Sequence, residues 1–398
     1  HSILKYWQTF APDNKTGGFH GAVDLNNHPV SEASRSCVLT SRILWTFSAA
    51  AMSFPERNYG IMADRAYNIL INYFKDPEYQ GFFMELDHLH QPADELKHTY
   101  AQAFVLYALS KYFEYSGDES VLKEISDFFL FLDSKTKDSE GKGYLEGFSK
   151  EWKPITQNRM ADDNDPKSMN THLHLLEAYA AVFKVWPNDL VRLRLTEILS
   201  LFQSQIIRED GHLGIFFDAD FIETKISRSI CSFGHDIEAS WLILEALEIL
   251  GDENKLDQMK PALIKMAEAV VREGVDQDGG LFLESTRHGS HLRTNKHWWL
   301  QAELLVGELN AFQETSNWKY WEMLKNSWNF IVQHVIDKKG GEWFTKVNRL
   351  GIPYLVEPAD DPSPYYRNDW KIDPWKCPYH NGRAMLELIK RIDGILQK

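Results

Sequence analysis

Three short segments carry histidines and carboxylates at spacings that suit proton-transfer chemistry. The most distinctive is residues 234–241, which read Gly-His-Asp-Ile-Glu-Ala-Ser-Trp and open a helical apolar pattern. On a helix His235 and Glu238 lie one turn apart, at i,i+3. A carboxylate there can orient an imidazole, fix its tautomer and raise its basicity, so the pair suits a general base. The alternative is a surface or helix-capping histidine beside an acidic residue.

A second segment, residues 167–177, reads Lys-Ser-Met-Asn-Thr-His-Leu-His-Leu-Leu-Glu. On a helix its two histidines point in different directions, which argues against a His-x-His metal chelate. Asn170, His174 and Glu177 share one face instead. That face could hydrogen-bond a hydroxylated ligand, although a satisfied core histidine is the structural alternative. No matching spacings complete a di-iron or zinc set elsewhere, and we expect no metal.

The third segment, residues 373–383, reads Asp-Pro-Trp-Lys-Cys-Pro-Tyr-His-Asn-Gly-Arg. Pro378 suits the first turn of a final helix, which places His380 within that turn and Trp375 on the loop before it. The chain has 13 tryptophans, and aromatic faces stack on the apolar faces of pyranose rings. Trp298 and Trp299 lie near the start of the predicted helix 295–315, and two adjacent side chains on a helix cannot both face the same side. The composition therefore suits a sugar site.

An internal repeat indicates the elements that hold these segments. A glycine followed by aromatic or apolar residues recurs at Gly18, Gly81, Gly143, Gly211, Gly280 and Gly341. Six units of about 65 residues account for the whole chain. Apolar residues between the glycines predict two helices in each unit. The first helices end near residue 10 and then cover 59–75, 118–133, 188–207, 253–272 and 316–336, and the second cover 38–53, 96–115, 167–185, 234–250, 295–315 and 378–396.

Short links carrying proline or glycine join each second helix to the next first helix, which favours antiparallel neighbours. We therefore predict an all-α fold, an (α/α)6 barrel of twelve helices with short β-hairpins in the loops, forming a single catalytic domain over 1–398. An open solenoid has the same period, but the broad apolar faces of the second helices favour a closed inner ring.

In such a barrel the N-terminal ends of the inner helices converge at one mouth. The candidates near those ends are Arg42, Tyr100, Asn170 with His174, His235 with Glu238, Trp298 and His380. Helix N-termini carry partial positive charge, so a ring of them favours an anion at its centre.

The amino-acid composition limits the kinds of molecule that the protein could bind. The 43 basic and 57 acidic residues give a net charge of −14 without a basic cluster, which disfavours nucleic acid. The longest apolar runs are about half of the roughly 18 to 20 residues that a membrane span needs. No nucleotide motif is present, and we expect no cofactor. Cys37, Cys231 and Cys377 lack disulfide or zinc spacing, which fits a cytoplasmic protein.

The three segments, together with residues 42–48, resemble those of cellobiose 2-epimerases within the N-acylglucosamine 2-epimerase superfamily. The resemblance runs essentially end to end. It implies a cofactor-independent enzyme that interconverts a β-1,4-linked glucose disaccharide and its reducing-end mannose epimer. It implies that His235 and His380 exchange the C2 proton, that His174 and Arg42 attend the substrate oxygens, and that Glu238 supports its histidine. Sugar contacts are implied for Tyr100, Asp162, Trp298 and Trp375.

The chemistry of these residue types agrees with that implication. Removal of a hydrogen next to an aldehyde needs a stabilised enediolate, and reprotonation on the opposite face needs two bases or rotation of the intermediate. A mannose isomerase of the same superfamily remains an alternative, as does a non-catalytic sugar-binding scaffold. A glycoside hydrolase would need two carboxylates, for which Glu238, Asp162 and Glu303 could be nominated, but the histidines would then lack roles. We expect a disaccharide substrate, no nucleic-acid or membrane partner, and a monomer or weak homodimer.

Overall fold

The computed structural model describes residues 1–157, 164–287, 289–356 and 367–397. Twelve α-helices lie within these residues. Six form an inner set: α2 (Cys37–Ser53), α4 (Thr99–Ser116), α6 (Met169–Val185), α8 (Phe233–Leu250), α10 (Trp298–Thr315) and α12 (Tyr379–Leu396). Six form an outer set: α1 (Ser2–Phe10), α3 (Gly60–Ile69), α5 (Glu119–Thr136), α7 (Asp189–Leu201), α9 (Glu253–Glu273) and α11 (Trp318–Phe330). Single π-helical turns extend three outer helices, at Leu70–Phe74, Phe202–Ile206 and Ile331–Val335, and 3₁₀ turns cover Pro55–Arg57 and Ser227–Ser229.

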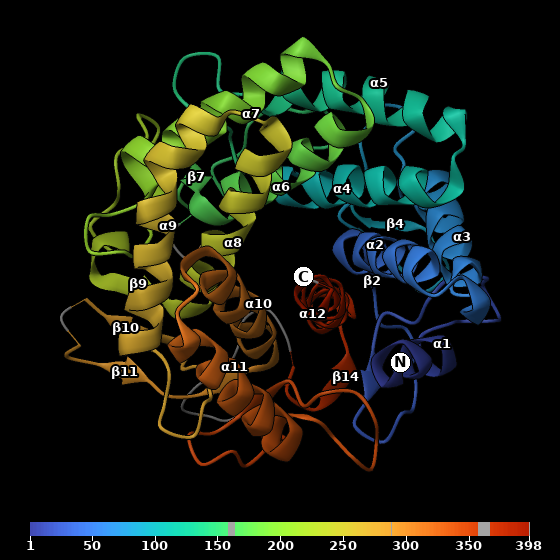
Figure 1. Cartoon of the computed structure of the whole chain (residues 1–398). Helices are drawn as coiled ribbons and strands as arrows, with labels where there is room; N and C mark the ends of the chain where they lie inside the picture. The colour runs from blue at the N-terminus through green and yellow to red at the C-terminus, as the bar shows by residue number, and fades with distance from the viewer. Residues whose placement is uncertain (158–163, 288, 357–366, 398) are drawn as a thin grey trace.

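The inner helices form a ring. Each contacts the next, from α2 through α4, α6, α8 and α10 to α12, and α12 returns to contact α2. Figure 1 shows this ring around a central axis with the outer helices flanking it. Each of α3, α5, α7, α9 and α11 packs on the inner helix before it in the chain, while α1 packs on α12. The mostly helical architecture predicted from the periodicity is confirmed over the described residues.

The distribution of buried side chains along each helix explains why some helices lie in the inner set and others in the outer set. Helix α2 buries nearly every side chain from Cys37 to Ala51, as expected of a helix that is surrounded by others. Helix α9 buries one stripe that includes Met259, Leu263 and Met266, as expected of a helix with one face in water. None of the helices in the described ranges is both long and apolar enough to cross a membrane.

Strands of two or three residues precede the inner helices and mostly join neighbouring repeat units. The antiparallel pairs are β2 (Arg35–Ser36) with β3 (Glu85–Leu86), β5 (Lys97–His98) with β6 (Gly147–Phe148), β7 (Lys167–Ser168) with β8 (Phe216–Phe217), β9 (Ile230–Ser232) with β10 (Glu284–Thr286), β12 (Lys296–His297) with β13 (Lys346–Val347), and β1 (Val23–Asp24) with β14 (Trp370–Ile372). Among the described residues, β4 (Pro92–Asp94) and β11 (Leu292–Arg293) form hairpins within a unit, with β3 and β10, and other units contain single antiparallel bridges such as Val23 with Pro29. Val23 opposite Ile372 joins the first unit to the last.

A buried ion pair recurs with the repeat and anchors the start of five of the six inner helices. An aspartate in the glycine turn holds a cation from the strand that precedes the helix, as in Asp76 with Lys97 at 2.8 Å. The equivalent pairs are Asp13–Arg35, Asp138–Lys167, Asp276–Lys296 and Asp337–Lys371. The fourth unit has Arg208 in the turn, paired with Glu223. These contacts fix the inner-helix ends that carry the candidate site.

Candidate active site

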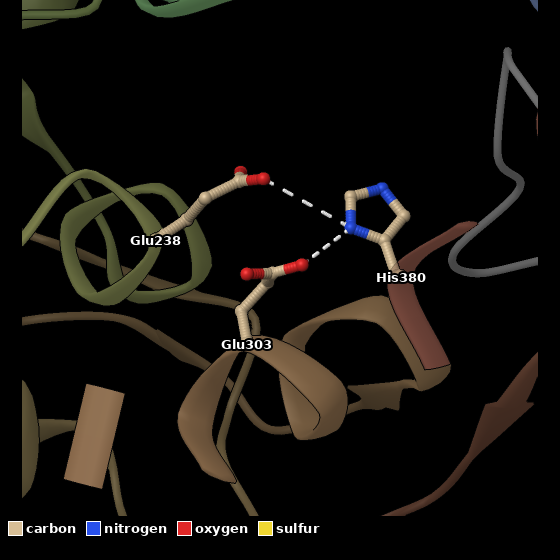
Figure 2. Close-up of side chains that lie close together, drawn as sticks. All are labelled: Glu238, Glu303 and His380. Atoms are coloured by element: carbon tan, nitrogen blue, oxygen red, sulfur yellow. Dashed lines mark hydrogen bonds and ion pairs between the residues drawn. The ribbon is translucent and has the colours of Figure 1, made fainter. Parts of the chain in front are cut away.

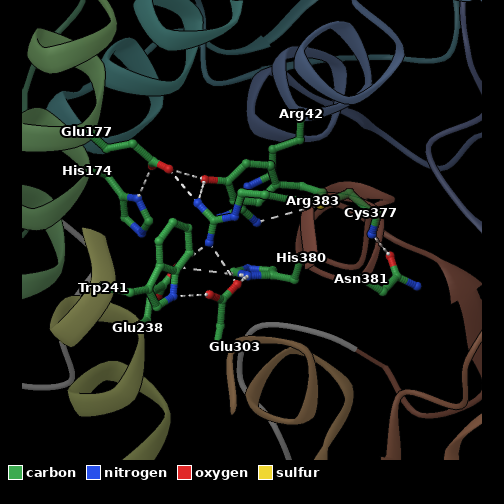
Figure 3. A network of polar contacts seen from close by, with 12 residues as sticks. Arg42, His174, Glu177, Glu238, Trp241, Glu303, Cys377, His380, Asn381 and Arg383 are labelled. Atoms are coloured by element: carbon green, nitrogen blue, oxygen red, sulfur yellow. Dashed lines mark hydrogen bonds and ion pairs between the residues drawn. The ribbon is translucent and has the colours of Figure 1, made fainter. Parts of the chain in front are cut away.

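The early turns of the inner helices bring the predicted residues together. Arg42 of α2 donates from Nη2 to the Tyr100 hydroxyl of α4 at 2.7 Å. The Tyr100 ring meets the His174 ring of α6 edge-on, with centroids 5.1 Å apart. The rings of His235 of α8 and His380 of α12 both lie against the ring of Trp299 of α10. All six inner helices therefore contribute to one polar centre, part of which is drawn in Figure 3.

Arg42 is a buried cation without an ionic partner. Its side chain is 3% exposed, and its other donors reach the Trp375 carbonyl at 3.4 Å and the Cys377 sulfur at 3.8 Å. Within the described ranges no carboxylate lies at ion-pair distance from it. Its guanidinium also lies 4.2 Å from the Phe104 ring centroid. A buried positive charge with neutral partners is suited to stabilise an anion that forms during a reaction.

His174 and Glu177 interact as their i,i+3 spacing predicts. His174 Nδ1 lies 2.9 Å from Glu177 Oε2, so the Nδ1 proton is directed at the carboxylate and Nε2 keeps its lone pair. Burial lowers the pKa of His174, against the opposing effect of Glu177. Burial would raise the pKa of Glu177, but Arg383 and His174 hold it at about 2. The imidazole is neutral and its partner is ionised.

His380 is held in the same way from a different helix. Its Nδ1 lies 2.7 Å from Glu303 Oε1 of α10 and 3.9 Å from Glu238 Oε1 of α8, as Figure 2 shows. Burial, reinforced by Arg42, lowers the pKa of His380 well below its ordinary range. A neutral imidazole with Nδ1 occupied offers Nε2 as a base.

The predicted pairing of His235 with Glu238 is wrong. His235 Nδ1 instead lies 2.8 Å from the Ser232 hydroxyl, and Glu238 accepts a hydrogen bond from Arg383 at 3.0 Å. The i,i+3 spacing is present, but the charged guanidinium is the stronger partner for a carboxylate. Burial, with a smaller contribution from His174, lowers the pKa of His235 to about 4. This side chain is therefore a neutral imidazole at neutral pH.

Arg383 connects the supporting carboxylates. Its Nη1 donates to Glu177, and its Nη2 donates to Glu238 at 3.0 Å and to Glu303 at 2.7 Å (Figure 3). Glu238, Glu303 and His380 offer ligand atoms within 4.8 Å of one another, a spacing that a metal ion could use. Since one guanidinium nitrogen already bonds to both carboxylates, the protein itself supplies a positive charge at that position. The geometry favours an ion-pair network.

The two adjacent tryptophans of α10 differ in their surroundings. Trp298, the predicted sugar contact, is 2% exposed, with Lys376 Nζ 5.9 Å from its ring centroid. Trp299 is half-buried, and its ring centroid lies 4.9 Å from that of His235 and 5.6 Å from that of His380. The helix begins at Trp298, later than predicted.

The remaining predicted contacts lie at the mouth or outside the described residues. Trp375 is half-buried, its amide donates to Asp373 Oδ1 at 2.7 Å, and its ring centroid lies 5.8 Å from that of Tyr100. Asn170 is half-buried in the first turn of α6. Asp162 lies outside the described residues.

Sequence reasoning assigned no role to Arg383 or Trp299, and it considered Glu303 only as a hydrolase carboxylate. Spacing offered a signal for all three. Arg383 follows His380 at i+3, and Glu303 follows Trp299 at i+4, so each shares a helix face with a residue at the site.

Comparisons with known proteins place the chain in a family. Residues 17–366 match the N-acylglucosamine 2-epimerase (GlcNAc 2-epimerase) family. A cellobiose 2-epimerase from Bacteroides fragilis is 35% identical over 97% of this chain and 95% of its own. The structure of a cellobiose 2-epimerase from Spirochaeta thermophila superimposes with a TM-score of 0.86 at 35% identity, covering 99% of this chain and 94% of that one. A D-mannose isomerase from Marinomonas mediterranea is 22% identical over 75% of this chain and 73% of its own.

A helical ring with neutral imidazoles and a buried arginine at its mouth is the scaffold of an enzyme that epimerises carbohydrates. The chain belongs to the N-acylglucosamine 2-epimerase family.

Proposed function

We propose that this protein inverts C2 of the reducing-end glucose of β-1,4-linked disaccharides such as cellobiose and lactose, giving the mannose epimer. The observation that carries the proposal is the pair of neutral imidazoles, His235 and His380, which both lie against Trp299 within the centre that also holds Arg42. In this proposal residues 1–398 act as one (α/α)6-barrel domain, a cytoplasmic monomer or weak homodimer, without a metal or other cofactor.

The first step is removal of the C2 proton. One imidazole Nε2 takes the proton, and the electron pair of the C2–H bond moves into the C1–C2 bond as the carbonyl oxygen becomes an oxyanion. The product of this step is a cis-enediolate. Arg42 and the imidazole of His174 stabilise the developing negative charge, which the low-dielectric surroundings make more effective. Their effect is greatest in the transition state, because the ground-state carbonyl carries little charge.

The second step returns a proton to C2 from the opposite face. His235 and His380 come from different inner helices and have different supports, Ser232 for one and Glu303 for the other. Two bases on separate walls, or rotation of the intermediate between them, can meet this requirement. A single fixed base would return the proton to the face from which it came. The pair of histidines therefore accounts for inversion.

Aromatic and polar side chains near the histidines are suited to hold the sugar. We propose that Trp375 covers the non-reacting ring, that Tyr100 and Asn170 contact hydroxyls, and that Trp299 stacks against the reacting sugar. Asp162 remains a proposed sugar contact. These assignments follow from half-burial or from packing beside the histidines.

Reaction in D₂O tests the proposal. Incubation with cellobiose should place deuterium at C2 of the product, as read by NMR, without added metal or nucleotide. His235→Ala and His380→Ala should each lose at least about 10²-fold in kcat while they stay folded by circular dichroism. The control is His28→Ala, because the His28 side chain is 77% exposed and should leave the rate unchanged. Full activity in either site variant contradicts the assignment.

A mannose isomerase is the second candidate, because the relatives include a D-mannose isomerase at lower identity. The same imidazoles would move the proton from C2 to C1, and mannose would yield fructose. Comparing kcat/KM for mannose and cellobiose separates the two. A glycoside hydrolase receives less support, because Glu238 and Glu303 both bond to Arg383 and Glu303 also holds His380, so these two carboxylates do not form a free acid–nucleophile pair.

A further inference from the structure

Three carboxylates converge on one guanidinium at the centre of the ring. Glu177 of α6, Glu238 of α8 and Glu303 of α10 all accept hydrogen bonds from Arg383 of α12. Each of the four side chains is at most 5% exposed. The cluster therefore carries three potential negative charges and one permanent positive charge away from water.

That charge balance is unfavourable if all three carboxylates are ionised. The neighbouring imidazoles, His174 and His380, are neutral because burial lowers the pKa of each. Even with the nearby buried cation Arg42 counted, one negative charge would then lie in the protein interior without a counterion. Like charges that share such a site raise the pKa of one member until it holds a proton. One of the three carboxyl groups should therefore be neutral.

The hydrogen bonds identify which carboxyl group that is. Glu177 accepts from His174, Tyr379 and Arg383. Glu303 accepts from His380 at 2.7 Å, from Trp241 Nε1 at 3.2 Å and from Arg383 at 2.7 Å. Among the described residues, Glu238 accepts only from Arg383, at 3.0 Å. Because donated hydrogen bonds stabilise the ionised form, Glu238 is the least stabilised as an anion.

We propose that Glu238 is a neutral carboxylic acid in the resting protein and that Arg383 is a positioning residue, which keeps Glu177 and Glu303 ionised so that they orient His174 and His380. Arg383 and the three carboxylates then form one unit that sets the tautomers of two imidazoles from two different helices. The catalytic consequences of this inference rest on the proposed function. The protonation state of Glu238 is independent of that function.

The electrostatic surroundings agree with this assignment. Burial, followed by repulsion from Glu303, raises the pKa of Glu238 well above its usual range, although Arg383 opposes both effects. Burial also raises the pKa of Glu303, to a lesser extent. Glu177 has a pKa of about 2. The other charged or titratable groups around Glu238 are Arg42, Tyr100, Tyr379 and His380.

Glutamine substitutions distinguish the three positions, because glutamine is close in shape to a protonated glutamate but carries no charge. Glu238→Gln should lower kcat/KM for cellobiose at least about tenfold less than Glu303→Gln does, since it replaces a neutral group by another. Glu303→Gln should lose at least about 10²-fold, because the amide cannot hold the Nδ1 proton of His380 as an anion does. Arg383→Lys should lower kcat/KM at least about tenfold, because a single ammonium nitrogen cannot donate to Glu177 and to Glu303 in the way that the two terminal nitrogens of the guanidinium do.

Infrared difference spectroscopy reads the protonation state directly and needs no catalysis. The spectrum of the wild type minus that of Glu238→Gln should contain the carbonyl stretch of a buried carboxylic acid between pH 6 and 8, with a shift in D₂O. Burial also raises the pKa of Glu308, but that residue is present in both proteins and its band cancels. The spectrum of the wild type minus that of Glu303→Gln should lack the band. Its absence from the first difference spectrum overturns the proposal, as does a Glu238→Gln protein that is folded but as inactive as Glu303→Gln. A wild type whose difference spectrum contains the band but which does not epimerise cellobiose refutes the proposed function alone.

Discussion

Replacing Arg42 by methionine should impair the reaction without weakening the fold. The Arg42 guanidinium is buried and has hydrogen-bond partners that are all uncharged, namely the Tyr100 hydroxyl, the Trp375 carbonyl and the Cys377 sulfur. Among the described residues no carboxylate lies at ion-pair distance from it. If its role is to meet the negative charge of an enediolate, its contribution should appear in the rate and not in the stability.

The magnitudes follow from that environment. Loss of one donor to a developing oxyanion reduces kcat by about 10² to 10³-fold. The stability change should be small, because the lost hydrogen bond to Tyr100 contributes about 1 kcal/mol and removing an unpaired buried charge offsets it. Arg42→Met should therefore change the free energy of unfolding by less than about 1 kcal/mol, or raise it.

Arg383→Met is the matched control, since Arg383 is equally buried but bonds to three carboxylates. Removing it leaves buried acids without a counterion, which should cost about 3 to 5 kcal/mol. Urea unfolding gives the stabilities, and the rate of mannose-epimer formation from cellobiose gives kcat and KM. The reasoning is refuted if Arg42→Met is destabilised as strongly as Arg383→Met, or if it retains wild-type kcat.

Three further predictions concern specificity, pH and stability. In Trp375→Ala, kcat/KM for cellobiose should fall by a factor that corresponds to about 1 to 3 kcal/mol of lost transition-state stabilisation, and kcat/KM for mannose should change little. Equal losses on both substrates would indicate a packing role. Because the pKa of His235 is about 4, its base form persists in mildly acidic solution, and the acid limb of kcat/KM should lie below pH 6.5. A limb at 6.5 would indicate an unperturbed histidine. Although burial opposes it, Asp236 raises the pKa of His212 to about 11, with Nδ1 on Asp236 at 2.7 Å. That pair stabilises the fold below about pH 6.5 and loses its effect as the pH rises towards 11, so His212→Gln should lower Tm more at pH 6 than at pH 10.

The local parts of the fold could be predicted from the sequence. Breakers such as Pro55 and Gly117 mark the ends of α2 and α4, and apolar spacing marks their bodies. The contact of His174 with Glu177 also follows from spacing, because both lie on one helix and Glu177 Oε2 is within hydrogen-bond reach. The pairing of strands between units was not predicted, since strands of two or three residues carry no register signal in their sequence.

The errors at the candidate site have one physical origin. His235 and Glu238 have suitable spacing, but Glu238 bonds to Arg383, which is 145 residues away in the chain and approaches from the last helix. Trp298 and Trp299 are consecutive on α10, and the rotation of that helix about its axis, which packing sets, brings Trp299 against the histidines. Partners from other helices and helix rotation are tertiary properties, and one segment of sequence does not contain them.

The pairing of Val23 with Ile372 has a consequence for how the protein is made. This seam joins a strand of the first repeat unit to a strand of the last, which is synthesised much later. A contact so distant in sequence forms late, because its loop-closure entropy is repaid only after the intervening units have packed. Helix α12 follows the seam and carries His380 and Arg383, so the proposed acid–base pair is completed only when the ring has closed. A chain that ends before α12 lacks both side chains, even where its earlier units have packed.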